Sequence, residues 1–476
     1  MTNVTRLIRS DAASDVGSDQ HWVQRALRAP LSRIATNPWI DAPGLWSIGA
    51  IYMPLSRLWA AASVAGGDPD RFLAEIPIDR ANAVARTGLS ATLRRHEHKR
   101  IRAASVTEEW ADRFFAAKTV PASDLQALEA RRIAQAQKYM LERLRFAHHL
   151  LGLGRAVPGV RFEVPSPDDV RRLCGEYLND PPLAFRPPDR DPLVERSASI
   201  ASVYGNDYWL RFDSPSHRIG GQAWARVHEP KGGGAMPTFI FANGVCMDVD
   251  EWRMAPPELV RLCRSGVRVV ELVPPWHGRR SMPGFYGGEP FFGTAPQGPI
   301  DLFTAMVQEI ALLIGWSRQQ GEAPVAIGGV SMGAIASMLV AGYSGGWPGH
   351  LRPDALALVA FATDIADLAF ESAISEIAGV PDAMRARGWT SDALAEIARL
   401  TAGTGEPGVD PAAIVAVLGA RDTVTPSDQG RALMTKWGVP SENVFERDLG
   451  HLSIAADLSR DDAPIVRLAE ILRSMR

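Results

Sequence analysis

One serine in this chain stands where a strong nucleophile could be built. Residues 328–334 read GGVSMGA and contain the pattern G-x-S-x-G around Ser331. The apolar run PVAIGGV precedes this serine, and the helix-like run MGAIASMLVAG follows it. A strand that turns sharply into a helix strains the backbone of its serine and crowds the residues two before and two after it. The pattern therefore predicts a nucleophile elbow; the alternative is a strand–helix turn that happens to use serine.

A serine hydroxyl needs a base to remove its proton. After an elbow of this kind, an acid and then a histidine follow along the chain. Two histidines follow Ser331, namely His350 and His451. His350 lies in a Pro- and Gly-rich segment, whereas His451 lies in VFERDLGHLSIA, between a predicted strand and the predicted C-terminal helix. We predict that His451 is the base; the alternative is a structural or helix-capping histidine.

Two aspartates are candidates for the acid that orients this imidazole. Asp422 follows the apolar run IVAVLG, in a turn bounded by Gly419 and Pro426, and Asp364 follows the run ALVAFAT. The acid holds the histidine tautomer and stabilises the charged imidazolium. We predict Asp422 because its turn closes a strand, and Asp364 remains the alternative acid.

Acyl transfer also needs hydrogen-bond donors for the oxyanion. The backbone N–H of Met332, directly after the serine, is one predicted donor. The second belongs in the loop after the third predicted strand, within TFIFANGVCMDVDEW, where we predict the N–H of Val245. Asn243 and Gly244 begin this loop and are candidates for substrate contact.

A second loop, PPWHGRRSMPGFYGG at 274–288, follows the fourth predicted strand. His277 precedes the serine in the chain, and its loop comes one connection too late to carry the oxyanion donors. Arg279 and Arg280 would either meet an anionic group of the substrate or be solvated. We keep His277, Arg279 and Arg280 as candidate substrate-loop residues.

Strands and helices alternate after residue 200. Predicted strands cover 208–212, 222–227, 238–242, 267–273, 325–330, 355–360, 414–418 and 444–447. Several are continuous apolar runs, as expected for a parallel sheet covered on both faces. The first two, joined by SPSHRIGG, predict an antiparallel hairpin at the sheet edge. The predicted fold class is α/β, with a mostly parallel, doubly wound sheet.

Other segments surround this sheet. Residues 1–185 predict an N-terminal helical domain, and residues 186–199, rich in proline and charge, predict a linker to a catalytic domain at 200–476. Residues 366–410 predict a helical cap insertion over the edge where α/β folds keep their sites. Within the N-terminal domain, RRHEHKR at 94–100 predicts a solvated helix face.

Composition limits the class of protein. The 476 residues carry a net charge of -3, which argues against a nucleic-acid partner. Three scattered cysteines indicate a reducing compartment, and no signal peptide is evident, so we expect a cytoplasmic protein. The apolar stretch at 44–67 is interrupted by Pro54 and Arg57, which disfavours a membrane span. Its tryptophans Trp46 and Trp59 keep peripheral membrane contact as an alternative.

The motifs GVSMG, ANGV, LGARDTVTP and DLGHLS together resemble the α/β-hydrolase superfamily over roughly residues 200–476. Within it, PPWHGRRSMPGF, GVSMGAIAS and GHLS are similar to a sparsely characterised branch of α/β-hydrolase-domain proteins linked to lipid acyl esters. Asn243 departs from the histidine that is common at its position, which leaves the shape of the oxyanion loop open. The resemblance implies a triad of Ser331, Asp422 and His451, a helical cap, and no metal or organic cofactor.

The leading hypothesis is a serine hydrolase that cleaves a small-molecule or lipid-like carboxylic ester through an acyl-enzyme. Amides, thioesters and carbon–carbon bonds are open to the same groups. An acyltransferase on the same triad is one alternative. A non-catalytic scaffold that binds a partner or a membrane surface is the other, and the order of serine, acid and histidine argues against it. The sequence sets neither the acyl length nor the oligomeric state.

Overall fold

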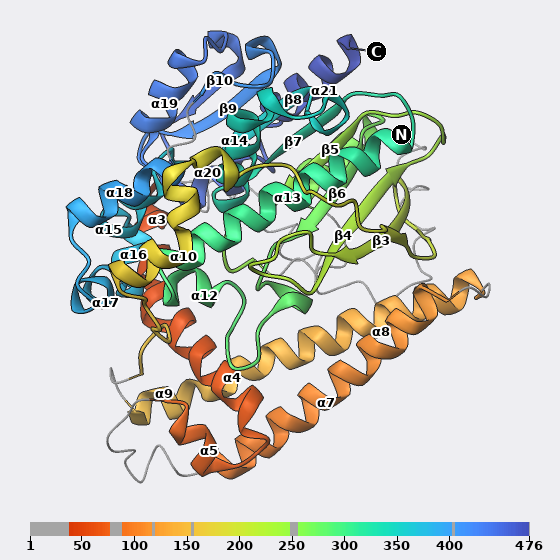
Figure 1. Cartoon of the computed structure of the whole chain (residues 1–476). Coiled ribbons are helices and arrows are strands. Elements are labelled where there is room, and N and C mark those ends of the chain that lie inside the picture. The colour runs from red at the N-terminus through yellow and green to blue at the C-terminus, as the bar shows by residue number, and fades with distance from the viewer. Residues whose placement is uncertain are drawn as a thin grey trace, which may run out of the picture.

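A computed structural model describes residues 38–76, 88–116, 120–153, 157–247, 256–401 and 405–475. The first 37 residues of the predicted N-terminal domain, and residues 248–252 of the predicted oxyanion loop, lie outside this part. The described residues form a mixed sheet, helices on both of its faces, and a helical region below it (Figure 1).

The sheet contains ten strands within the described part of the chain. Its spatial order is β1-β3-β4-β6-β5-β7-β8-β9-β10, with β2 paired to β3. The pairs β1–β3, β2–β3, β3–β4 and β4–β6 are antiparallel. The remaining pairs, from β6–β5 to β9–β10, are parallel. The bounds are β1 (Glu195–Arg196), β2 (Ile200–Ala201), β3 (Gly205–Asp213), β4 (Gln222–Pro230), β5 (Thr238–Ala242), β6 (Arg268–Val273), β7 (Val325–Val330), β8 (Ala355–Val359), β9 (Ile414–Gly419) and β10 (Val444–Arg447).

This topology is an α/β-hydrolase fold, and it confirms the predicted fold class. All eight predicted strands are present within a few residues of their expected bounds, and the first two form the expected antiparallel hairpin. Strands β5, β6 and β9 are buried at every position because helices cover both faces of the sheet. Parallel strands of this kind gather their carboxyl ends, and the loops that follow them, at one edge.

Helices α11 (Pro257–Arg264) and α21 (Ala463–Ser474) contact one another against the sheet, as do α13 (Gln297–Gln319) and α14 (Met332–Tyr343). Figure 1 shows α13 and α14 in front of the strands. In the described part of the chain, α13 is the one helix long and apolar enough to cross a membrane, and 89% of its apolar stretch is buried inside the protein. Its apolar character is therefore accounted for by the core.

The segment predicted as a cap contains α15 (Ile365–Glu371), α16 (Ala373–Ala378), α17 (Val380–Ala386) and α18 (Ser391–Thr401). Helix α10 (Pro167–Asn179), from before the predicted linker, packs against α18. Helix α19 (Ser427–Lys436) packs on β9, and α20 (His451–Asp457) follows β10.

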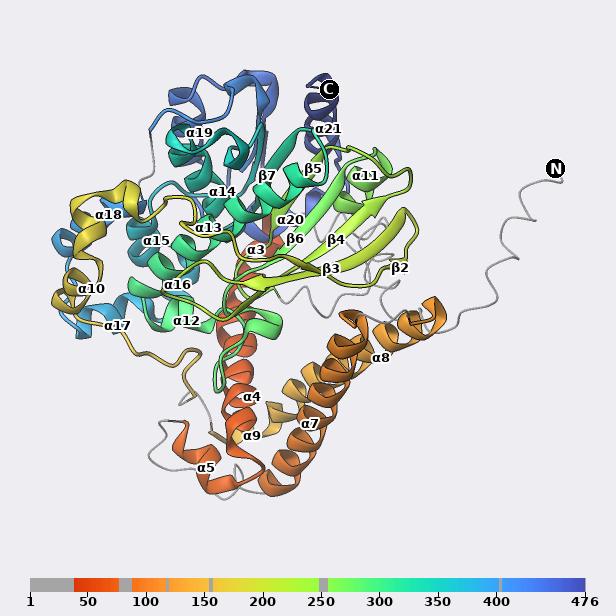
Figure 2. The same ribbon diagram turned by 45° about the vertical axis from the view of Figure 1, so that its right-hand side comes forward.

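The N-terminal helices do not form a detached body. Helix α3 (Asp41–Ser47), a π-helical turn (Ile48–Tyr52) and α4 (Met53–Ala65) follow one another and run from the sheet edge to the lower helices (Figure 2). There, α7 (Leu89–Phe114) packs along α8 (Ala122–Met140), with α5 (Pro69–Ala74) and α9 (Ala147–Leu153) nearby. Aromatic side chains of α7 pack on Trp209 of β3 and Trp224 of β4. The lower helices therefore pack against the outer strands β3 and β4.

Two expectations for this region need correction. Residues 186–199 are partly sheet rather than only a linker, because β1 pairs with β3 and Ala198 donates a backbone hydrogen bond to Phe114. His96, within the predicted solvated face, is fully buried. Its ring packs against Trp59 and other aromatic rings. The polar sequence around His96 gives no indication of this packing.

A buried ion pair links α4 to the part of the chain that contains the sheet. Arg57 donates to Glu289 at 3.0 and 3.1 Å and to the carbonyl of Gly284 at 2.7 Å. Glu289 begins α12 (Glu289–Gly293) and also accepts from the backbone N–H groups of Arg161 and Tyr286. The two side chains are 1% and 0% exposed, so neither charge has access to bulk water.

We expect Arg57→Met to lower the free energy of unfolding by about 3–5 kcal/mol, because it leaves the Glu289 carboxylate buried without its partner. Urea denaturation measures the change. Arg385→Ala is the matched control, since its ion pair with Asp382 is exposed and should contribute about 0–1 kcal/mol. Equal stability changes in the two variants would contradict this interpretation.

Candidate active site

Ser331 lies in the turn between β7 and α14 with φ 53° and ψ −119°, a strained conformation for a residue other than glycine. Two glycines permit this turn. A Cβ at Gly333 would lie 2.0 Å from the carbonyl oxygen of Ala242, and one at Gly329 would lie 2.3 Å from the same atom. The elbow therefore exists because α14 approaches the backbone of β5 more closely than any side chain allows.

His451 lies between the serine and an aspartate. Its Nε2 is 3.0 Å from Ser331 Oγ, and its Nδ1 is 2.8 Å from Asp422 Oδ2. An ionised carboxylate can only accept, so the imidazole proton is on Nδ1 and Nε2 is free to accept from the serine hydroxyl. The structure thus brings together Ser331, His451 and Asp422, which come from three separate strand ends.

Asp422 is held rigidly. Its Oδ1 accepts from the backbone N–H groups of Val424 and Thr425 at 2.8 Å, and its Oδ2 accepts from Thr425 Oγ1 at 2.7 Å. Burial is the largest influence on the pKa of Asp422 and would raise it, but His451 and the Thr425 hydrogen bonds together keep it below the usual value. The carboxylate is therefore ionised and aimed at the imidazole.

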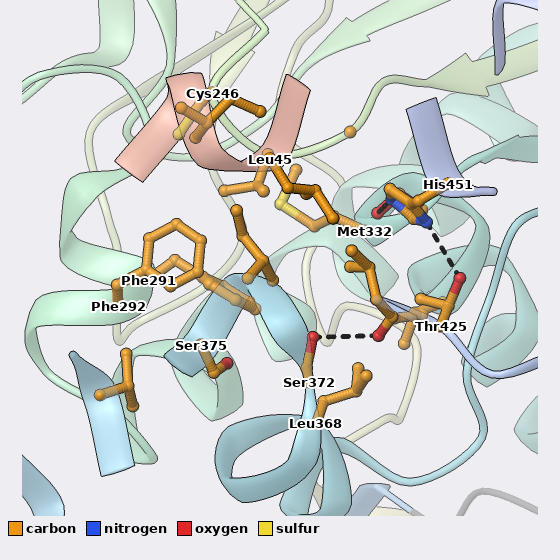
Figure 3. A pocket seen from close by; sticks show the side chains of 18 of the residues that line it. Leu45, Cys246, Phe291, Phe292, Met332, Leu368, Ser372, Ser375, Thr425 and His451 are labelled. Carbon is orange, nitrogen blue, oxygen red and sulfur yellow. Dashed lines mark hydrogen bonds between the residues drawn. The ribbon is translucent and has the colours of Figure 1, made fainter. Parts of the chain in front are cut away.

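Thr425 was not singled out by the sequence analysis. Its Oγ1 lies 3.1 Å from His451 Nδ1 (Figure 3). The same hydroxyl donates to the Asp422 carboxylate. The signal available was the Asp-x-x-Thr spacing of RDTVT, which allows the aspartate to bind the amide and hydroxyl of a residue three positions later.

Asp364, the alternative acid, lies at the N-terminus of α15. Asp364 caps α15, where its Oδ1 accepts from the N–H of Ala366 at 2.8 Å. The imidazole Nδ1 is bound by Asp422 instead. Asp364 therefore begins the cap, and the structure does not support it as the orienting acid.

The predicted oxyanion donors both line the cavity beside Ser331. A Cβ at Gly244 would lie 3.5 Å from Ser331 Cβ, so the loop after β5 passes directly over the serine. Among the described residues, the N–H groups of Val245 and Met332 donate no hydrogen bond. Two unused amides next to a nucleophile are what an oxyanion would require.

His277 supports this loop from behind and is not a substrate contact. Its Nε2 accepts from the N–H of Cys246 at 3.0 Å, and its Nδ1 donates to the carbonyl of Pro275 at 2.8 Å. The side chain is fully buried and lies outside the cavity lining. A Cβ at Gly288 would lie 2.7 Å from Nε2, so a glycine is needed there.

Asn243 also faces away from the cavity, whereas Gly244 lines it. The Asn243 amide donates to Glu271 Oε1 at 2.9 Å. Glu271 Oε2 lies 3.3 Å from His228 Nε2, and His228 Nδ1 lies 3.2 Å from Asp207 Oδ1. This buried polar chain anchors the start of the oxyanion loop to β6, β4 and β3.

The prediction that Arg279 and Arg280 of the 274–288 loop contact the substrate is wrong, because neither lines the cavity. Arg280 is 4% exposed and pairs with the fully buried Glu309 of α13 at 2.7 Å. Arg279 lies over the ring of Trp224 at 4.3 Å, and over two further tryptophans at similar distance. Both fix the loop to its surroundings, and neither can meet an anionic group in this cavity.

The cavity beside Ser331 has a volume of about 360 Å³. In Figure 3, Leu45 from α3 lies on one side, the cap residues Leu368 and Ser372 on the opposite side, and Phe291 at the far end. The lining residues from the N-terminal region are Leu45, Ile48, Tyr52 and Met53. These four residues were not predicted, because the sequence of an apolar helix does not indicate which distant surface the helix covers.

Charged groups are scarce in this cavity. Within the described residues, its lining contains no Asp, Glu, Lys or Arg. The same part of the chain contains no cluster of three His, Cys, Asp or Glu able to hold a metal ion.

Comparison with solved structures finds similar folds among esterases. Acetyl xylan esterase 1 from Thermoanaerobacterium sp. has a TM-score of 0.44 and 17% identity, over 66% of this chain and 96% of that chain. The rice cell wall degrading esterase LipA from Xanthomonas oryzae has a TM-score of 0.39 and 11% identity, over 66% and 98%. The esterase from the archaeon Pyrobaculum calidifontis has a TM-score of 0.36 and 16% identity, over 65% and 93%. No protein-family model and no curated protein sequence matches this chain. Similarity at this level assigns no activity, so any activity has to follow from the geometry of the site.

We expect Gly333→Ala to lower stability by about 1–3 kcal/mol, because the new methyl group must push α14 away from β5. Gly175→Ala is the control, since a Cβ there meets no atom within 4 Å, and its position inside α10 predicts a slightly more stable protein. Thermal denaturation of both variants tests this close approach. A Gly333→Ala protein as stable as the wild type would show that the elbow has more room than the structure describes.

Proposed function

We propose that this protein is a serine esterase that cleaves uncharged, apolar carboxylic esters through an acyl-enzyme. The observation that carries the proposal is the continuous chain from Ser331 Oγ through His451 to Asp422, which opens into an apolar cavity. Such a chain is the arrangement that turns a serine hydroxyl into a nucleophile.

In the first half-reaction, His451 Nε2 takes the hydroxyl proton as Ser331 Oγ attacks the ester carbonyl. The N–H groups of Val245 and Met332 then stabilise the negative charge on the carbonyl oxygen. When the ester C–O bond breaks, the imidazolium returns its proton to the departing alkoxide, which leaves as an alcohol. The acyl group is now bonded to Ser331.

In the second half-reaction, water replaces the alcohol. His451 takes a proton from the water as its oxygen attacks the acyl carbonyl, and the same two amides bind the oxyanion. The bond to Ser331 Oγ breaks and the serine regains its proton. The acid is released, and throughout the cycle Asp422 orients the imidazole and stabilises its charged form.

The proposed substrate class follows from the lining. Removing an uncharged hydrocarbon group from water into aliphatic and aromatic side chains is favourable. A charged group would enter the same cavity without a partner, at a large desolvation cost. The lining therefore supports esters with an apolar acyl or alcohol group, in keeping with a lipid-like or small-molecule ester.

A panel of p-nitrophenyl esters of increasing acyl length tests the reaction. We expect hydrolysis by the wild type, and a fall in kcat of about 10³–10⁴-fold in Asp422→Asn, because the amide presents the wrong group to the imidazole. Asp364→Asn is the matched control and should retain near wild-type kcat, because that residue caps a helix of the cap. A folded wild type that hydrolyses none of these esters would contradict the proposed function.

The size of the cavity should limit the length of the acyl chain that the protein accepts. We expect Ala369→Phe, which adds a ring to the cap side of the cavity, to reduce kcat/KM for the longest accepted ester far more than for the acetate. Ala386→Phe changes an exposed residue of α17 outside the lining and should leave the profile unchanged. Parallel losses for short and long esters would argue against acyl binding at Ala369.

A further inference from the structure

An aspartate at the start of the described chain binds the helix that carries the proposed base. Asp41 Oδ1 accepts from the N–H groups of Leu452 and Ser453 at 2.6 and 3.2 Å. Its Oδ2 accepts from Ser453 Oγ at 2.5 Å. Leu452 and Ser453 lie in the first turn of α20, whose first residue is His451. One carboxylate from α3 thus satisfies the free end of a helix more than 400 residues later in the chain.

This contact is built into the packing. Asp41 is 8% exposed. A Cβ at Gly450 would lie 2.4 Å from Asp41 Cγ, and a Cβ at Gly44 would lie 2.7 Å from the side chain of Leu452. Neither glycine has a positive φ, so their relevance here lies in the space they leave. A side chain at Gly450 would displace the Asp41 carboxylate, and one at Gly44 would displace the end of the Leu452 side chain.

Helix α20 has little means of holding His451 by itself. It spans His451–Asp457, seven residues, and helices of this length are unstable without tertiary contacts. Its first amides have no intrahelical acceptor and need one from elsewhere. Asp41 supplies that acceptor, so the carboxylate fixes the start of α20 and with it the Cα of His451.

We propose that Asp41 is a positioning residue for His451, through which the N-terminal helix α3 becomes part of the catalytic machinery. The proposal rests on the proposed function, because it assigns His451 the role of base. Asp41 touches neither the serine nor the cavity; it acts through the placement of α20. Helix α3 also contributes Leu45 to the cavity wall, so the same helix binds the start of α20 and lines the cavity beside Ser331.

Three variants isolate this role. Asp41→Ala removes the acceptor. Asp41→Asn keeps an oxygen for the two backbone amides and places an N–H₂ group against Ser453 Oγ. The Ser453 hydroxyl can then donate to the carbonyl of Gly450 instead. Asp68→Ala is the matched control: Asp68 caps α5 by accepting from Asp70 and Arg71, far from the site.

We expect Asp41→Ala to lower kcat for p-nitrophenyl butyrate by about 10–100-fold, with KM little changed, because a small displacement of the base impairs proton transfer. Asp41→Asn should recover most of kcat. Asp68→Ala should lower the melting temperature while keeping wild-type kcat. Wild-type kcat in Asp41→Ala, or an equal loss of kcat in Asp68→Ala, would overturn the proposal.

A second measurement does not depend on ester hydrolysis. The His451 Nδ1 proton, hydrogen-bonded to Asp422, should give a low-field NMR resonance that His451→Gln removes. We expect this resonance to shift or broaden in Asp41→Ala and to return in Asp41→Asn. An unchanged resonance in Asp41→Ala would overturn the role of Asp41. A wild type that shows the resonance but cleaves no ester would overturn the proposed function alone. A wild type without it would contradict the imidazole geometry on which both proposals depend.

Discussion

The close approach of α14 to β5 is the constraint on which the rest of the site depends. The carbonyl of Ala242 lies so near Gly329 and Gly333 that no side chain fits at either position. Between these two glycines Ser331 adopts a positive φ, and its hydroxyl lies 3.0 Å from His451 Nε2. The loop after β5 leaves the sheet at the same point, so the serine and the amides of the proposed oxyanion hole are positioned by one backbone contact.

Local patterns were enough to predict the sheet and to single out Ser331, Asp422 and His451. Apolar runs mark buried parallel strands, and Ser331 and Asp422 each follow such a run, whereas His451 follows the short strand β10, which has no buried position. Long-range contacts were not predictable in this way. Arg279 and Arg280 belong to a tryptophan cluster and a buried ion pair whose partners lie far away in the sequence. Asp41 acts through hydrogen bonds to residues more than 400 positions later in the chain, and His96 is buried although its neighbours are charged. The Thr425 contact is local, three residues from Asp422, and its spacing was a signal that the sequence did offer.

The N-terminal region and the sheet-containing region both line the cavity beside Ser331. Helix α3 and the following turn form one wall of the cavity, and the cap helices form the opposite wall. The Arg57–Glu289 pair and the aromatic packing of α7 on the outer strands hold the lower helices to the sheet. Residues on both sides of the predicted linker at 186–199 line the cavity. The linker therefore does not divide the chain into two separate functional units.

The proposed esterase activity depends on Ser331 being an activated nucleophile. A fluorophosphonate probe tests it most directly, since the probe bonds covalently to a serine whose proton is removed by a nearby base. We expect stoichiometric labelling of the wild type, located on Ser331 by peptide mass spectrometry, and no labelling of folded Ser331→Ala or His451→Ala. Labelling that persists in His451→Ala, or a folded wild type that is never labelled, would contradict it.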